Sequence, residues 1–443
     1  MADLHMVDLI EAKRDGGELT DKQISWFVEG VTAGTIPDYQ TAALLMAIYF
    51  QGMSRRETVD LTLAMARSGD ELDLHDVAPV VVDKHSSGGV GDKTTLVVQP
   101  LVAACGVPVG KMSGRGLGPS GGTLDKMESI RGWSSQLTLS QFKEQLAEIG
   151  LVLAGQTADL APADGKMYAL RDVTGTVPSI PLIAASIMSK KLAGGADAVV
   201  LDVKVGSGAF VPTVVAGQEL ARLMVEIGAD AGRAMTALIS DMNQPLGHTV
   251  GNALEVKEAI ATLQGKGPKD FWAHCVEVAG HMLVLSQQVE TLEEARAQVM
   301  AARDGGQAFA KFRQMVKAQG GDTDQVDDPQ QLPQAEMAVD LVAPRSGYIA
   351  RMDTAALGWA AARLGAGREK KGDPIDFAVG FLMPVKVGDH LQQGDLLATI
   401  HADDAEKLGQ AQRQILEALT WSEEPVDPLP HFYGVVRPGT VGS

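Results

Sequence analysis

A stretch of small, polar and charged residues, DKHSSGGVGDKTT (83–95), stands between two apolar runs, PVVV (79–82) and LVV (96–98). Its glycines would let backbone N–H groups approach an anion closely, and its lysine, histidine, serine and threonine side chains could supply charge and hydrogen-bond donors. This composition predicts a phosphate cradle. A single glycine-rich loop is a weak signal, however, because a turn without a ligand has the same composition.

A second glycine-rich stretch, KMSGRGLGPSGGTLDKMES (111–129), strengthens this interpretation. Five glycines fall between Gly114 and Gly122. They lose much backbone entropy on folding, and close approach to a ligand is the simplest compensation. A tight loop between a strand and a helix is the alternative. Two such loops in one predicted sheet favour the ligand.

The charge of the chain limits the kinds of partner. Its 443 residues carry a formal net charge of −18, which argues against a broad nucleic-acid-binding face. An anionic ligand must therefore be held by local cations. Several lie in segments rich in Gly, Ser and Thr, although each could be an ordinary surface residue: Lys84, Lys111, Arg115, Arg171, Lys190 and Lys191.

Composition indicates an intracellular protein of more than one domain. The chain is too long for one core, and its longest useful apolar run, AALLMAIYF (42–50), is too short to span a bilayer. The N-terminal residues lack a signal-peptide core, so we expect a cytoplasmic location and no membrane partner. The two cysteines are distant, and the nine histidines form no metal-ligand pattern. A structural metal is not expected.

The elements that would position these residues fall into three parts. Residues 1–70 read as helices, two of them opened by capping boxes at Thr20 with Gln23 and Ser54 with Glu57. From Val80 onward, short β-branched runs alternate with helices, which predicts a largely parallel sheet with ligands at the carboxyl ends of its strands. The strand candidates are PVVV, LVV (96–98), VPVGKM, LVLAG and DAVVLDVKVG.

We therefore expect an α/β protein with two lobes and a further module. An all-α lobe spans 1–70 and is continued by 161–195; an α/β lobe spans 71–160 and 196–335; an α+β module spans 336–443. Each crossing between the lobes is a natural hinge, with the ligand site in the cleft.

The C-terminal segments DLVAPRSGYIARM and FLMPVKVGDHLQQGDLLATIHADD resemble the two halves of the β hammerhead of biotinyl and lipoyl carrier domains. A carrier presents its modified lysine at a hairpin tip after the second half. The place expected for that tip reads Ile400, His401, Ala402 and Asp403, without a lysine. We therefore interpret the module as structural.

Four motifs together resemble those of the thymidine and pyrimidine-nucleoside phosphorylases. They are DKHSSGGVGDKTT, SGRGLGPSGGTLDKME, RDVTGTVPSIPLIAASIMSKK and DVKVGSGAF, in this order, and the likeness covers essentially the whole chain. The resemblance implies a homodimeric pentosyltransferase of pyrimidine salvage. It implies reversible phosphorolysis of uridine, thymidine and deoxyuridine, giving the free base and α-D-(deoxy)ribose 1-phosphate, with inorganic phosphate as co-substrate and no other cofactor.

The resemblance also implies roles for particular residues. His85, Arg171 and Lys190 would be catalytic, and the pyrimidine would bind Arg171, Ser186 and Lys190. The phosphate group would bind Lys84, Ser86, Thr95, Ser113 and Thr123. Arg171 and Lys190 are donors only, while Ser186 can also accept, which suits carbonyl oxygens that flank a ring N–H.

One departure from the family concerns a monovalent cation. Some bacterial relatives bind one near the first loop, with a threonine where this chain has Lys93. The other matching positions would be Gly91, Leu246, Thr249 and Glu258. The Lys93 ammonium could reach the carboxylate and replace the metal, so we expect no potassium requirement. A solvated lysine is the alternative.

Three questions stay open from the sequence. Relatives that accept both uridine and thymidine resemble this chain in having lysine at Lys111, which favours the broad enzyme over a deoxy-selective thymidine phosphorylase. An anthranilate-phosphoribosyltransferase-like enzyme would share the fold but needs Mg²⁺ and a diphosphate site. A non-catalytic binding protein would explain the C-terminal module but not two phosphate loops.

Overall fold

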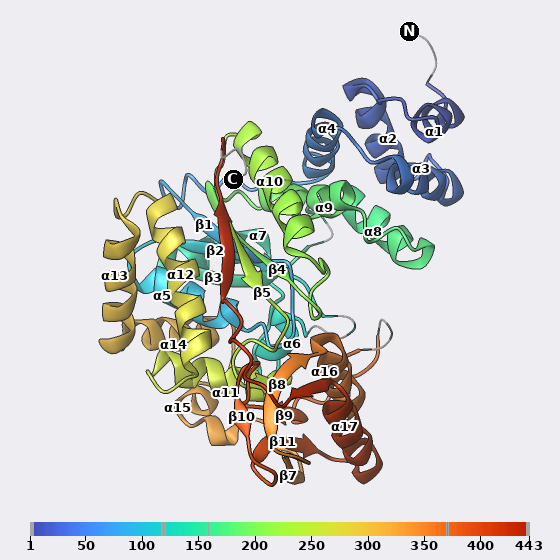
Figure 1. The fold of residues 1–443 in the computed structure, drawn as a ribbon. Coiled ribbons are helices and arrows are strands. Elements are labelled where there is room, and N and C mark those ends of the chain that lie inside the picture. Colours follow the sequence, from blue (N-terminus) through green and yellow to red (C-terminus); the bar gives the residue numbers. More distant parts are fainter. Residues whose placement is uncertain are drawn as a thin grey trace.

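The computed structural model describes residues 4–116, 118, 121–157, 159–368, 370 and 372–439. Residues 117, 119 and 120 of the second glycine-rich loop lie outside this range. Figure 1 shows a group of helices beside a sheet-containing body, with a C-terminal module against another side of that body. None of the described helices is long and apolar enough to cross a membrane.

The helical group combines two distant segments of the chain. Its first four helices are α1 (Met6–Arg14), α2 (Asp21–Ala33), α3 (Asp38–Gln51) and α4 (Arg55–Ala66), and it is joined by α8 (Pro162–Thr174) and α9 (Ile180–Ala193). Both expected capping boxes are present, at the starts of α2 and α4. Met167 and Leu182 share one buried cluster with Phe27 and Leu44, so the later segment packs onto the earlier helices.

The central sheet has six strands in the order β13-β5-β4-β1-β2-β3. Five are parallel, and β13 pairs antiparallel with β5 at the edge. This confirms the expected α/β fold with a mostly parallel sheet. The strands are β1 (Val82–Ser86), β2 (Val109–Ser113), β3 (Leu151–Gly155), β4 (Ala198–Val205), β5 (Ala234–Asp241) and β13 (Phe432–Val436).

Helices cover both faces of this sheet, because alternate residues of a strand point to opposite sides. Leu201 and Val203 of β4 pack with α10 (Val214–Asp230), whereas Val200 belongs to the cluster that includes α5 (Thr94–Ala104) and α12 (Lys269–Leu285). The remaining helices of this body are α6 (Thr123–Met127), α7 (Leu139–Ile149), α11 (Asn252–Leu263), α13 (Leu292–Asp304), α14 (Gln307–Ala318) and α15 (Asp324–Asp327).

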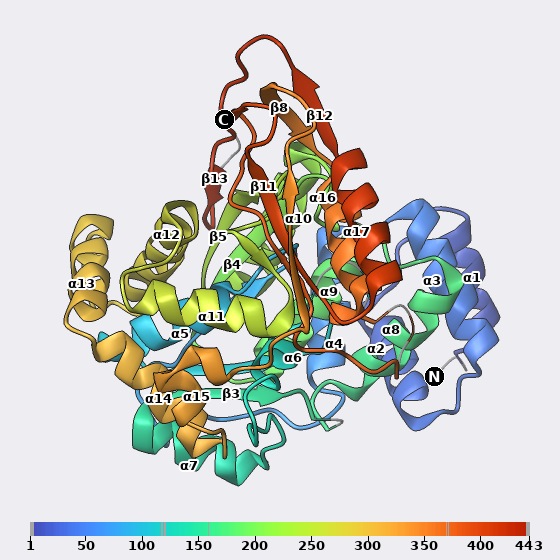
Figure 2. The same cartoon turned by 90° about the horizontal axis from the view of Figure 1, so that it is seen from below.

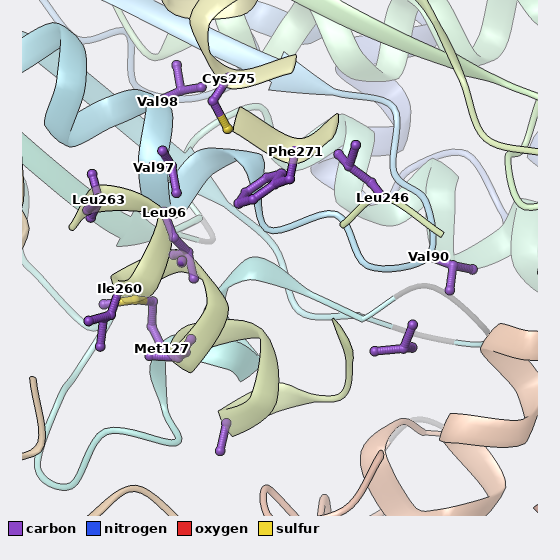
Figure 3. Packing of buried hydrophobic residues seen from close by; sticks show 14 of the residues in the cluster. Val90, Leu96, Val97, Val98, Met127, Leu246, Ile260, Leu263, Phe271 and Cys275 are labelled. Carbon is purple, nitrogen blue, oxygen red and sulfur yellow. The ribbon is translucent and has the colours of Figure 1, made fainter. Parts of the chain in front are cut away.

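Two expectations about the first loop were wrong in detail. The run LVV (96–98) lies in α5 and not in a strand; Figure 3 shows its three residues packed among Phe271, Cys275 and other apolar side chains. A short apolar run cannot be distinguished from part of a fully buried helix by periodicity alone. The segment Asp83–Ser86 is the end of β1, so the loop itself begins at Ser87.

The C-terminal module contains two small sheets, in the orders β10-β8-β12 and β6-β9-β11-β7. The strand β6 (Thr249–Val250) comes from the α/β body, so its pairing with β9 joins the module to that body, where α11 contacts both strands. Figures 1 and 2 show the module beside this body. The other elements are β7 (Met337–Val342), β8 (Gly347–Met352), α16 (Thr354–Ala361), β9 (Gly380–Leu382), β10 (His390–Leu391), β11 (Leu396–Ala402), α17 (Ala405–Glu417) and β12 (Leu419–Ser422).

The expected hairpin tip of this module is not a tip. Ile400, His401 and Ala402 lie inside β11, where they pair with β7. Asp404 then caps α17 by accepting hydrogen bonds from two backbone N–H groups. The strand therefore leads directly into a helix at the place where a carrier domain would present its lysine.

Candidate active site

Two neighbouring cavities lie where the helical group faces the carboxyl ends of β1, β2 and β4. The larger, of about 320 Å³, is lined by both glycine-rich loops, and the smaller, of about 220 Å³, by α8, α9 and the loop after β4. They share His85, Ser86, Tyr168, Lys190 and Phe210, so they form one continuous cleft. A larger cavity, of about 540 Å³ between α2 and α4, contains none of the residues singled out from the sequence.

The first loop is organised by the buried carboxylate of Asp92. Ser86 Oγ donates to Asp92 Oδ2, and Thr94 donates to Asp92 Oδ1 through both Oγ1, at 2.7 Å, and its backbone N–H, at 3.2 Å. Burial alone would raise the pKa of Asp92, but the charges of Lys84 and other lysines hold this pKa well below its usual range. An ionised Asp92 therefore fixes Ser86 and the start of α5, where Thr95 lines the larger cavity.

Lys84 lies beneath this loop and lines neither cavity. It is fully buried, and its Nζ has no hydrogen-bond partner among the described residues. The nearest carboxylate, Asp202 at 4.0 Å, already accepts from Lys204 Nζ at 2.5 Å, Ser240 Oγ at 2.6 Å and His274 Nε2 at 2.8 Å. Burial lowers the pKa of Lys84. Its ammonium is thus a cation beneath the loop without a hydrogen-bonded acceptor.

The second loop closes the other side of the larger cavity. Ser113 ends β2 and Thr123 begins α6, and both line the cavity. Asp125 fixes the loop between them, because its Oδ2 accepts from the Gly116 N–H at 2.7 Å. Arg115 also lines the cavity, and its Nη2 donates to Glu128 Oε1 at 2.6 Å. The larger cavity therefore combines hydroxyls from both loops.

The smaller cavity is lined by Arg171, Ser186 and Lys190. Arg171 is buried and donates to the backbone carbonyls of residues 176, 177 and 182, which leaves two of its five N–H donors for another acceptor. Lys190 Nζ donates to Ser186 Oγ at 2.9 Å and to Asp164 Oδ2. Burial lowers the pKa of both cations. The cavity thus offers fixed donors to a planar ligand with carbonyl oxygens.

His85 lies at the junction of the two cavities. Burial and the charges of Lys191, Lys111 and Lys190 lower the pKa of His85 well below its usual range. Its imidazole is therefore neutral at pH 7 in the unliganded protein. An anion in the larger cavity would raise this pKa by offsetting the positive charges.

Lys111 projects from β2 into the larger cavity. Its Nζ donates to the backbone carbonyl of Lys84 and lies 3.7 Å from Asp83 Oδ1. Asp83 is already paired with Lys191 Nζ at 2.6 Å. Burial, followed by the neighbouring charge of Lys191, lowers the pKa of Lys111 to about 7. Its amine is therefore partly uncharged at neutral pH.

The five residues of the expected cation locus lie together, next to the first loop. Lys93 Nζ is fully buried and lies 2.6 Å from Glu258 Oε1. It donates to the carbonyls of Leu246 at 2.7 Å and Thr249 at 3.1 Å. A Cβ added at Gly91 would lie 2.7 Å from the same Leu246 oxygen, so this position needs glycine. Lys93 is thus not a solvated lysine. The described residues contain no cluster of three or more His, Cys, Asp or Glu that could hold a metal.

Several cleft residues were missed from the sequence. Asp92 belongs to the first motif, but the motif assigns it no role, and Phe210 lies in a loop that gives no periodic signal. A signal did exist for Asp164 and Tyr168: together with Arg171 they are spaced by four and three residues, so they share one face of α8. Tyr168 lines both cavities, and its ring centroid lies 5.8 Å from the Arg171 guanidinium carbon.

Three family models together match most of the chain. Residues 78–309 match the a/b domain of a glycosyl transferase family, and residues 7–69 match the helical bundle domain of a glycosyl transferase family. Residues 348–422 match the pyrimidine nucleoside phosphorylase C-terminal domain.

Curated relatives match over nearly their full length. The chain is 51% identical to the pyrimidine-nucleoside phosphorylase of Geobacillus stearothermophilus, over 96% of this chain and 98% of that protein. It is 50% identical to the pyrimidine-nucleoside phosphorylase of Staphylococcus aureus strain N315, with the same coverage. Among solved structures, anthranilate phosphoribosyltransferase from Thermus thermophilus has a TM-score of 0.58 at 19% identity, over 70% of this chain and 99% of that one. This last likeness concerns the fold alone.

Proposed function

The chain belongs to the pyrimidine-nucleoside phosphorylase family, and from this premise we propose that it catalyses the reversible phosphorolysis of pyrimidine nucleosides in salvage. The observation that best supports the proposal is the meeting of the two cavities at His85. One cavity offers hydroxyls and loop N–H groups suited to a small tetrahedral dianion, and the other offers donors suited to a pyrimidine edge. The sugar would lie between them.

In this proposal phosphate is the nucleophile. A phosphate oxygen forms a bond to C1′ of the nucleoside while the C1′–N1 bond breaks, and the electron pair of that bond leaves with the base. Attack from the face opposite the base inverts C1′ and gives the α-pentose 1-phosphate. The phosphate would be held by the buried ammonium of Lys84 beneath the loop and by the hydroxyls of Thr95, Ser113 and Thr123. Ser86 would join them if its hydroxyl turned from Asp92 to the phosphate.

Negative charge develops on the departing pyrimidine, so fixed donors near it would lower the barrier. Arg171 and Lys190 would supply that stabilisation, with Ser186 orienting the ring. His85 is neutral before phosphate binds, and the bound dianion would raise its pKa so that it can deliver a proton to the base. Closure of the helical lobe over the cleft would exclude water that could otherwise hydrolyse the sugar.

The finer points of the assignment are also proposals. We propose that the lobes divide at the boundaries given above, except that β13 (Phe432–Val436) belongs to the α/β lobe through its pairing with β5. We also propose that inorganic phosphate is the only co-substrate and that Lys93 makes added potassium unnecessary. We further propose that the helical lobe forms a homodimer. We also propose a cytoplasmic location, and the free state of Cys105 and Cys275 supports this location.

Lys111 favours acceptance of uridine as well as thymidine, because an amine in the cleft can form a hydrogen bond with a ribose 2′-OH. A deoxy-selective thymidine phosphorylase is the second candidate.

The proposal is tested by following the ultraviolet absorbance of uridine and of thymidine with and without inorganic phosphate. We expect base release only when phosphate is present. In His85→Ala the rate should fall by ~10²- to 10⁴-fold, the usual contribution of a general acid. The control is His281→Ala, which removes a buried histidine of α12 that does not line the cleft. Base release without phosphate, or full activity in His85→Ala, would contradict the proposal.

A further inference from the structure

One buried ammonium connects the two glycine-rich loops. Lys126 lies in α6 with 1% of its surface exposed, and it does not line either cavity of the cleft. Its Nζ donates to the Asp92 carbonyl of the first loop at 2.8 Å and to the Gly121 carbonyl of the second at 3.4 Å. The same atom lies 2.9 Å from Glu255 Oε2. A single side chain therefore bridges the two loops.

Both carbonyls belong to residues that control hydroxyls of the larger cavity. The Asp92 side chain fixes Ser86 and the start of α5, as described above. Gly121 is followed by Gly122, which precedes Thr123 at the start of α6. A Cβ added at Gly122 would lie 2.1 Å from the Gly116 nitrogen, so the second loop is tightly packed at this point. A shift of Lys126 would consequently move donors on both sides of the cavity.

Glu255 anchors this ammonium to the rest of the molecule. It lies in α11, and its Oε1 accepts from the Gly251 N–H at 3.2 Å. The start of α11 is joined to the C-terminal module, because Asn252 Nδ2 donates to the Ala366 carbonyl at 2.8 Å. A buried ammonium without a counter-charge is strongly disfavoured, so Glu255 is what allows a charged lysine to occupy this place.

We propose that Lys126 and Glu255 are positioning residues that set the affinity for phosphate without touching it. This inference rests on the proposed function only for the identity of the ligand. The geometry assigns to Lys126 the spacing of the two loops and to Glu255 the placement of Lys126. The C-terminal module, through α11, thereby contributes to the phosphate site from outside the cleft.

The test uses a double variant in which Lys126→Met and Glu255→Gln are combined. It is compared with a matched double variant in the helical lobe that combines Lys13→Met and Glu57→Gln. Lys13 and Glu57 form a similarly buried pair at 3.0 Å, and neither residue lines the cleft. Both double variants remove the charges of a buried pair together, so neither leaves a single charge unpaired. Three quantities are measured: the KM for phosphate, the KM for uridine, and the rise in Tm caused by inorganic phosphate.

We expect the phosphate KM of the Lys126 and Glu255 double variant to rise roughly tenfold or more, since a misplacement of about 1 Å can cost ~10²-fold. The uridine KM should change less than about twofold, and the phosphate-induced rise in Tm should be lost. The Lys13 and Glu57 control should keep wild-type values for all three. An unchanged phosphate KM and an unchanged Tm response would overturn the inference.

The two readouts separate this inference from the proposed function. Phosphate could stabilise the wild-type chain without any cleavage of nucleosides; the proposed function would then fail. If this stabilisation were lost in the Lys126 and Glu255 double variant alone, the positioning role would stand. If nucleoside cleavage were normal and both double variants responded equally to phosphate, the pair would only stabilise the fold. The single variant Glu255→Gln provides a second measurement and should show the same phosphate-specific loss.

Discussion

At the scale of single residues, burial determines the charge of the basic groups in and beneath the cleft. It lowers the pKa of Lys84, His85, Lys111 and Lys190, and neighbouring cations lower the pKa of each of them further. The cleft therefore gathers basic groups whose charged forms are disfavoured. A dianion that enters it relieves this repulsion, which adds to its binding in spite of the negative net charge of the whole chain.

Lys111 makes the free-energy cost of burying a charged lysine measurable. Its pKa is about 7 in the folded protein, against about 10.4 for an unperturbed lysine in the unfolded chain. Between these values the unfolded state binds more protons, so the Lys111 contribution to stability increases as pH rises from about 7 to about 10. The cost is fully present below pH 7. Lys111→Met should therefore raise Tm relative to wild type more at pH 6 than at pH 9.

The control for this prediction is Lys22→Met, at an exposed position of α2, whose effect on Tm should not change with pH. The same Lys111→Met protein tests the substrate range. We expect its kcat/KM for uridine to fall relative to thymidine, because the methionine cannot bond the 2′-OH. An unchanged ratio would remove the argument for a broad enzyme and favour the deoxy-selective alternative.

At the scale of elements, the start of α5 is held by the buried ion pair of Lys93 and Glu258. Lys93 is the N-cap of α5, and its ammonium satisfies Glu258 and two carbonyls at once. Because Asp92 directly precedes this position and Thr95 follows it by two residues, the same lysine helps to fix the first loop. Because this ammonium is part of the polypeptide chain, dialysis cannot remove it.

We predict that the activity of the wild-type chain is the same within about twofold in potassium and in tetramethylammonium buffers, since the locus already carries a charge paired with Glu258. Lys93→Thr should lower activity in tetramethylammonium and recover part of it when potassium is added. The measurement is phosphorolysis at a fixed ionic strength. A marked potassium requirement in the wild type would show that Lys93 does not fill the locus.

Sequence patterns predicted some elements well and others poorly, for identifiable reasons. The capping boxes at Thr20 and Ser54 are local signals, and both are confirmed. The run 96–98 gave the wrong element because α5 is buried on all sides, which removes the polar face that marks a helix. The edge strand β13 was not predicted, since its pairing with β5 depends on residues far away in the chain.

The same distinction holds within the cleft. The motifs named the residues that the structure brings to the two cavities, with Lys84 beneath them. They could not reveal that Asp164 pairs with Lys190 or that Lys126 bridges the loops, because these contacts join separate elements. The roles of all these residues in catalysis stay predictions.

At the scale of the whole molecule, the helical lobe exposes large apolar side chains on neighbouring helices. Tyr39 and Phe50 of α3 are each 75% exposed, Val173 of α8 is 79% exposed, and Val7 of α1 is 52% exposed. The helices α1, α3 and α8 are in contact through α3. Large exposed apolar side chains on packed neighbouring helices are a feature of protein–protein interfaces.

We predict that these side chains form the dimer interface. Tyr39→Asp combined with Phe50→Asp should convert a dimer to a monomer, because each aspartate would place a charge in an apolar contact. Sedimentation velocity measures the result directly. The control Val215→Asp alters an equally exposed apolar residue on α10, outside this group, and should leave the mass unchanged. A dimer that survives the Tyr39 and Phe50 substitutions would place the interface elsewhere.

The edge strand β13 has a consequence for biosynthesis. Tyr433 Oη donates to Asp241 Oδ1 at 2.8 Å across a sequence separation of 192 residues, and Phe432 stacks on His274. At translation rates of ~5–20 residues per second, β5 would wait roughly 10–40 s on the ribosome before the strand that covers its edge is made. An uncovered strand edge is a template for pairing with other chains. The nascent protein would therefore be most prone to aggregation, and most in need of a chaperone, during this interval.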